Sequence, residues 1–291
     1  MTQPLLHDAL CQNGILTGAA QWIELAGGRT NQVWHVQEAS GRSICVKLYS
    51  SDAAENPMFP NHPDVELSAM RLLSGVGLAP KPITSLKFEG NWVNIYEYIP
   101  NTQGVDVRVS MARTLAELHS LPIAAGFANS VVGSTEILDH AQSMITDHTC
   151  AEVIALRPTV PAAAMSKTAL LHRDPVSTNF IVQSDRGILI DWQCPAFGDP
   201  SEDLSVVLSP AMQSLYGPTL WSQEDETVFL EVYAESNPNF DPSAFAALRP
   251  WYAWRLAVYC DWRAQSGARD YLAARDAEIS RLEELQKAKR Y

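Results

Sequence analysis

A short stretch in the middle of the chain places three oxygen-bearing side chains near the ends of two predicted strands. Asp174 and Asn179 lie five residues apart in a loop that leads into a strand, and Asp191 ends the strand that follows. A hairpin would bring these side chains to one rim, where carboxylate and amide oxygens suit Mg²⁺. Phosphoryl transfer needs a carboxylate to accept the proton of the attacking hydroxyl and further oxygens to hold the metal. We therefore predict Asp174, Asn179 and Asp191 as catalytic residues, with Asn179 and Asp191 as metal ligands.

A lysine inside an apolar strand is a second chemical signal. Lys47 follows Ile44-Cys-Val, and an unpaired ammonium would be costly to bury there. Glu66, on the helix predicted next, is the best candidate partner. Such a pair would place Lys47 on the α- and β-phosphates of ATP. The alternative is that Lys47 extends to solvent from an edge strand.

A turn between the first two predicted strands could cover phosphates. Gly27 and Gly28 let the backbone approach a ligand closely, and the side chains of Thr30 and Asn31 could donate to phosphate oxygens. The turn matches neither the glycine-rich loop of protein kinases nor a Walker A sequence. A plain hairpin turn is the alternative.

The elements that must position these residues fall into two groups. Apolar alternation predicts strands over 22–25, 33–36, 44–48, 83–88 and 92–98, with a helix over 61–73. After a predicted hinge at 99–104, helical spacing dominates over 107–121, 135–156 and the C-terminal part, interrupted by a β-rich segment at 169–191. This order predicts an α+β fold in two lobes. The N-terminal lobe, 1–98, would be an antiparallel sheet plus one helix that binds nucleotide. The C-terminal lobe, 105–291, would be mostly helical with a small β hairpin, and would carry catalysis and the acceptor site.

These motifs together resemble the aminoglycoside phosphotransferase and choline kinase superfamily, which has a protein-kinase-like fold, over about residues 25–208. The resemblance lies in the 27–31 turn, in 115–119 and in 190–204, and is strongest to the choline, ethanolamine and thiamine kinase branch. It implies ATP and Mg²⁺, and a hinge at Glu97 and Tyr98 whose backbone would bind adenine. Arg173 stands where the family usually has glycine, and Pro175 is also less usual.

The acceptor is predicted to be a small molecule with a hydroxyl group. Only seven residues separate Asp191 from Asp199, and none is Ser, Thr or Tyr, so no phosphorylatable platform for a peptide remains. Tyr259, Asp261 and Trp262 could hold an amino alcohol such as choline or ethanolamine through cation–π contacts and a counter-charge. The alternative is a buried helix whose aromatic residues only pack. An aminoglycoside or sugar kinase and a regulatory, nucleotide-binding pseudokinase stay open as functions.

Bulk composition limits the partners. A net charge of −12 argues against binding to nucleic acid or to an anionic membrane surface. The first residues lack a signal-peptide pattern, and there is no run of about 18 apolar residues for a membrane span. Five scattered cysteines fit reduced thiols. We expect a cytoplasmic enzyme without an obligate protein partner.

Overall fold

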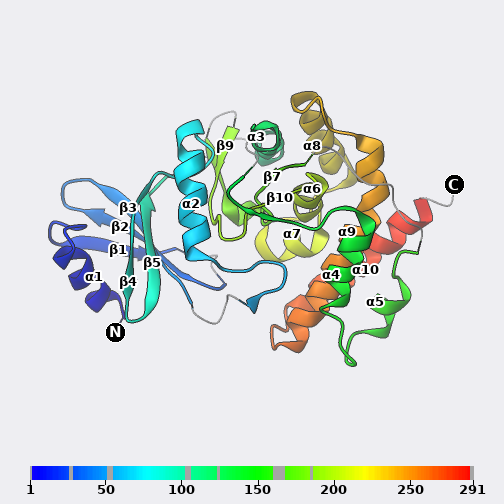
Figure 1. Ribbon diagram of the computed structural model, residues 1–291, viewed down its shortest axis with the longest axis horizontal. Helices are drawn as coiled ribbons and strands as arrows, with labels where there is room; N and C mark the ends of the chain where they lie inside the picture. The colour runs from blue at the N-terminus through cyan, green and yellow to red at the C-terminus, as the bar shows by residue number, and fades with distance from the viewer. Residues whose placement is uncertain are drawn as a thin grey trace. The chain divides into compact units, whose positions relative to one another are not determined.

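The computed structural model describes residues 2–25, 29–50, 55–101, 106–122, 125–159, 168–183 and 186–288. The chain divides into two compact units, seen as ribbons in Figure 1. Unit 1 comprises Met1–Asn101 and Ile188–Cys194, and unit 2 comprises Thr102–Gly187 and Pro195–Tyr291. The predicted α+β class is confirmed. Residues 102–104 of the predicted hinge lie outside the described residues, and the lobe boundaries stay a prediction.

Unit 1 is built on a five-stranded antiparallel sheet in the order β1-β2-β3-β5-β4. Its strands are β1 (Ala20–Glu24), β2 (Gln32–Glu38), β3 (Ser43–Leu48), β4 (Pro82–Phe88) and β5 (Asn91–Glu97). Successive side chains of a strand point to opposite faces. In β3, Ile44 and Val46 therefore lie on one face, whereas Cys45 and Lys47 lie on the other.

Helix α1 (Thr2–Gln12) covers the apolar face of this sheet, as Figure 1 shows. Leu6 and Leu10, one helical turn apart, are fully buried and share a core with Ile44 and Val46. The prediction of only one helix in the N-terminal lobe is therefore wrong, because α1 is present in addition to the helix predicted over 61–73. The four-residue spacing of the two leucines was a readable signal, because residues at i and i+4 lie on one helix face.

The predicted helix over 61–73 is confirmed as α2 (Pro63–Leu73), with the 3₁₀ turn η2 (Ser74–Val76) after it. Pro63 suits the first position of α2, because the N–H group that proline lacks would have no acceptor within the helix at that position.

The short strands of the remaining chain form two small sheets. Strands β6 (Ala128–Asn129), β7 (Ala169–Leu171) and β10 (Ala196–Gly198) make a three-stranded sheet in the order β6-β10-β7. The predicted hairpin is confirmed as β8 (Phe180–Gln183) and β9 (Arg186–Leu189), preceded by the 3₁₀ turn η3 (Ser177–Asn179). A Cβ at Gly187 in β9 would lie 2.1 Å from Cζ of Phe180, so a larger residue there would have to displace this buried ring.

Helices make up most of unit 2. They are α3 (Val107–Ser120), α4 (Gly133–Gln142), α5 (Ala151–Ala155), α6 (Ser201–Val207), α7 (Pro210–Tyr216), α8 (Gln223–Ser236), α9 (Pro242–Gln265) and α10 (Tyr271–Ala288). Ser222 and Asp225 form a capping box at the start of α8. In the part of the chain that the structure describes, every helix is too short or too polar to span a membrane.

One predicted helix of unit 2 is wrong. The segment 135–156 forms α4 and α5 instead, separated by turns. In the break, the backbone N–H of Thr146 donates to the Thr149 hydroxyl at 2.9 Å, and that of His148 donates to the Thr146 hydroxyl at 3.1 Å. Threonine hydroxyls thus replace the helical acceptors, which explains why the helix stops.

Candidate active site

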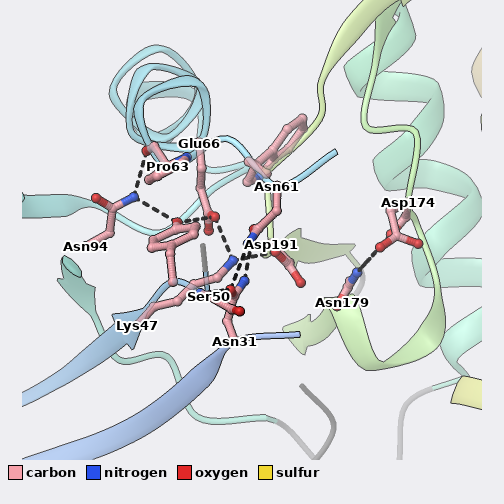
Figure 2. Close-up of polar contacts among 12 residues, drawn as sticks. Asn31, Lys47, Ser50, Asn61, Pro63, Glu66, Asn94, Asp174, Asn179 and Asp191 are labelled. Carbon is pink, nitrogen blue, oxygen red and sulfur yellow. Dashed lines mark hydrogen bonds and ion pairs between the residues drawn. The ribbon is translucent and has the colours of Figure 1, made fainter. Parts of the chain in front are cut away.

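Lys47 is buried in unit 1, and its ammonium group is bound between two carboxylates. Its side chain is 3% exposed, and its Nζ lies 2.6 Å from Glu66 Oε2 and also donates to Asp191, as Figure 2 shows. The predicted pairing with Glu66 is confirmed. The alternative of an edge-strand lysine extending to solvent is wrong, because β3 lies between β2 and β5.

Two further polar residues, which we did not predict, belong to the hydrogen-bond network around Glu66. The Tyr49 hydroxyl donates to Glu66 Oε2. Asn94 lies opposite Lys47 in the β3–β5 register, and its Nδ2 lies 2.8 Å from Tyr49 Oη and 2.8 Å from the Pro63 carbonyl oxygen. Two signals were available in the sequence: Tyr49 lies two residues after Lys47, and Asn94 interrupts an apolar strand. The structure buries Asn94 fully.

The electrostatics of this group favour a charged lysine. Burial by itself lowers the pKa of Lys47, but the carboxylates of Asp191 and Glu66 outweigh it and raise the pKa above its ordinary value. Burial raises the pKa of Tyr49, and Glu66 adds to the effect, so the hydroxyl stays a donor. A fixed ammonium in a site sheltered from water is suited to attract phosphate oxygens.

Asp191 follows β9 in a left-handed backbone conformation, with φ 64°. Aspartate adopts this region more readily than most residues. Trp192 is fully buried and donates its Nε1 to the Leu189 carbonyl at 2.8 Å, which fixes the turn. The Asp191 side chain is 29% exposed, so a cation could reach its carboxylate.

The other predicted catalytic residues lie in unit 2. Asn179 donates its Nδ2 to the Asp174 carbonyl at 3.0 Å and to Asp174 Oδ2 at 3.2 Å (Figure 2). The backbone N–H groups of His172 and Arg173 donate to the two carboxylate oxygens of Asp203 at 2.8 and 2.7 Å. The segment that carries Asp174 is therefore anchored to α6.

The donor chemistry fits a magnesium ion. Because the amide nitrogen of Asn179 faces Asp174, its oxygen is directed elsewhere, and oxygen is the ligand that Mg²⁺ prefers. Asp191 offers a carboxylate. Asp191 belongs to unit 1 and Asn179 to unit 2, and their convergence on one ion stays a prediction.

The predicted phosphate-covering turn is only partly described. Gly27 and Gly28 lie outside the described residues, and Thr30 is exposed. The Asn31 side chain exchanges two hydrogen bonds with that of Asn61, at 3.0 and 2.8 Å. One of the two N–H donors of the Asn31 amide is therefore used within the protein, and donation of the other to a phosphate oxygen stays a prediction.

The predicted adenine-binding residues lie at the end of β5. The N–H of Glu97 donates to the Lys81 carbonyl at 2.9 Å and is therefore not available to adenine. The Tyr98 ring stacks on that of His35, with centroids 3.7 Å apart and an interplanar angle of 10°. Binding of adenine at this segment stays a prediction.

The predicted acceptor residues lie on α9 and are largely occupied by neighbours. Asp261 accepts from Arg275 Nη1 at 2.9 Å and from Gln265 Nε2 at 2.6 Å, so its charge is balanced within the protein. Tyr259 is 2% exposed and stacks on Trp262, with centroids 6.0 Å apart. These contacts favour the packing alternative, and Asp261 is not the open counter-charge that we predicted.

Comparisons with known proteins agree with these features. The family model described as "Phosphotransferase enzyme family" matches residues 21–251, more than half of the chain. No curated protein matches the sequence.

Several solved structures share the fold. A choline/ethanolamine kinase family protein from Mesorhizobium loti is 14% identical with a TM-score of 0.67, and the match covers 98% of this chain and 95% of that one. A macrolide 2'-phosphotransferase from Brachybacterium faecium is 16% identical, with a TM-score of 0.64 and coverages of 94% and 97%. Amicoumacin kinase, solved with AMP-PNP and Ca²⁺, is 16% identical, with a TM-score of 0.63 and coverages of 97% and 93%.

Proposed function

Because the chain belongs to the phosphotransferase enzyme family, we propose that it transfers the γ-phosphoryl group of ATP to a hydroxyl group of a small molecule. The observation that carries this proposal is the buried Lys47, held between Glu66 and Asp191. Stability alone does not explain an ammonium kept charged in a buried site, since buried ion pairs seldom add stability. It is suited to neutralising the phosphates of a nucleotide.

In the proposed reaction, the two groups of residues act on one nucleotide. Lys47 binds the α- and β-phosphates, and Glu66 keeps it in place. Asp174 orients the acceptor hydroxyl and takes its proton as the hydroxyl oxygen bonds to the γ-phosphorus. The bond from that phosphorus to the β-phosphate oxygen breaks, and ADP leaves. Mg²⁺, bound by Asn179 and Asp191, would neutralise charge on the phosphates.

The proposed acceptor is an amino alcohol such as choline or ethanolamine, with an aminoglycoside, another antibiotic or a sugar as the alternative. Structural neighbours of the chain carry names of both kinds, choline/ethanolamine kinase and antibiotic phosphotransferase. The acidic composition also suits a cationic acceptor. A screen of amino alcohols, aminoglycosides, macrolides and sugars for acceptor-dependent ADP release would separate these classes.

Two substitutions test the assigned roles. Asp174→Asn is expected to lower turnover by roughly 10²-fold or more, the usual contribution of a general base, while MgATP affinity stays within about twofold. Lys47→Ala is expected to weaken MgATP binding at least about tenfold by isothermal titration, a loss of about 1.4 kcal/mol. Lys87→Ala is the matched control, because Lys87 is an exposed lysine of the same sheet, over the Trp92 ring.

The outcomes are distinct. Wild-type affinity for MgATP in Lys47→Ala would refute the nucleotide site. Tight MgATP binding by the wild type, without ADP release on any acceptor or in water, would instead favour the pseudokinase.

A further inference from the structure

Arg173, directly before Asp174, has an unusual backbone conformation for its residue type. Its φ is 71°, in the left-handed region that glycine adopts without strain and arginine does not. Among the described residues other than glycine, positive φ occurs only at Glu89, Arg173 and Asp191. Two of these three are in or beside the candidate active site, where strain is commonly associated with function.

The side chain of Arg173 joins a buried charge cluster on α6 and α9. Its Nε lies 3.4 Å from Glu202 Oε1, and Nη2 of Arg255 lies 2.8 Å from the same oxygen. Ser130 donates its hydroxyl to the other carboxylate oxygen of Glu202. Glu202 and Arg255 are each 1% exposed. Burial by itself raises the pKa of Glu202, but Arg255 and Arg173 outweigh it and lower the pKa to about 2, so Glu202 is an anion at neutral pH.

We propose that Arg173 is a positioning residue for phosphoryl transfer, using Glu202 as a permanent internal anion to fix the peptide that carries Asp174. The segment is held twice by consecutive residues of α6. Asp203 accepts from the backbone amides of His172 and Arg173, and Glu202 contacts the Arg173 side chain. Because Arg255 shares Glu202, the catalytic segment is also connected to α9.

Stability alone does not explain this arginine. Glycine at 173 would remove the strain and keep the backbone bonds to Asp203. Arg255 would still pair with Glu202 at 2.8 Å, so the buried carboxylate would not be left without a counter-charge. The strained backbone of Arg173 therefore destabilises the fold. We expect the compensating benefit to be the correct placement of Asp174. This inference rests on the proposed function, because the placement is measured through turnover.

Substitution of Arg173 by glycine distinguishes an effect on the placement of Asp174 from an effect on the stability of the fold. Arg173→Gly should keep or raise the melting temperature and leave the KM for MgATP within twofold, while the kcat of ADP release falls tenfold or more. Arg173→Ala keeps the strain without the charge, so it should show the same loss of kcat together with a lower melting temperature. Arg173→Lys should recover part of kcat. Arg186→Ala is the matched control, since Arg186 forms an exposed pair with Glu117 at 3.0 Å and should change none of these values.

A second measurement does not depend on activity. Hydrogen–deuterium exchange of amides 172–174 and 176–179 should be faster in Arg173→Gly than in the wild type, and unchanged in Arg186→Ala. A wild-type kcat in Arg173→Gly, or exchange equal to the wild type, would overturn the proposal. If the wild type itself releases no ADP, the proposed function fails, and the exchange measurement still decides whether Arg173 anchors the segment.

Discussion

Replacing Tyr49 by phenylalanine tests whether Glu66 is held by more than its lysine. The substitution removes one oxygen atom from a side chain that is 4% exposed and leaves the ring in place. Glu66 loses a donor to its Oε2, and Asn94 loses one of its two acceptors. The ring still lies over the Lys47 ammonium, 4.9 Å from it, so packing and the cation–π contact are retained.

The expected cost follows from the partner's charge. A hydrogen bond to an ionised group contributes about 1.5–3 kcal/mol, against about 1 kcal/mol for a neutral pair. At about 2–4 °C per kcal/mol for a chain of this size, the melting temperature should fall by roughly 3–12 °C. Urea unfolding should show a lower midpoint with an unchanged slope, which assigns the loss to the folded state. Affinity for MgATP should also fall, because Glu66 is less firmly held against Lys47.

Tyr252 supplies the matched control. Its hydroxyl is fully buried and has no hydrogen-bond partner among the described residues. Removing such a group is close to neutral or stabilising, so Tyr252→Phe should unfold within about 0.5 kcal/mol of the wild type or above it. Equal losses in the two variants, or no loss in Tyr49→Phe, would refute the role given to the Tyr49 hydroxyl.

Three further predictions concern other parts of the chain. Glu66→Gln removes a negative charge from buried Lys47, and titration calorimetry should show MgATP binding weaker than the wild type by about threefold or more, at 1.4 kcal/mol per tenfold change. Burial raises the pKa of Glu278 from 4.5 to about 7, so the folded protein holds a proton that the unfolded chain releases in this window. Stability should therefore decrease by about 3 kcal/mol as pH rises from about 4.5 to about 7, and a urea series of Glu278→Gln should lack that decrease. Ser222→Ala removes the capping box of α8 and should cost about 1 kcal/mol in thermal unfolding, whereas a loss below about 0.3 kcal/mol would contradict the cap's contribution.

The Lys47–Glu66 ion pair could be predicted from the sequence, and the reason is physical. A charged residue inside an apolar strand requires a partner, and the next helix offers few acidic candidates. The five strands of unit 1 and the hairpin of β8 and β9 were predictable in the same way, because apolar alternation is a local signal.

Contacts between distant segments were not predictable. The charge of Asp261 is balanced by Arg275, fourteen residues away on another helix. The sequence of α9 does not indicate this partner. The reciprocal bonds of Asn31 and Asn61 join residues thirty positions apart. The apolar periodicity predicted one helix over 135–156, but the helix ends at turn residues such as Thr146. Their hydroxyls compete with the backbone carbonyls as hydrogen-bond acceptors.

Strand β3 has two different faces: Lys47 lies on one, and the residues that pack against α1 lie on the other. This difference affects how the strand pairs during folding. A slip of one residue would turn the ammonium into the leucine-lined core and bring Val46 beside the Glu66 carboxylate. Two errors would arise together, an unpaired cation in an apolar layer and an abandoned buried anion, each costing several kcal/mol. The same lysine that we assign to the nucleotide thus also selects the correct strand alignment.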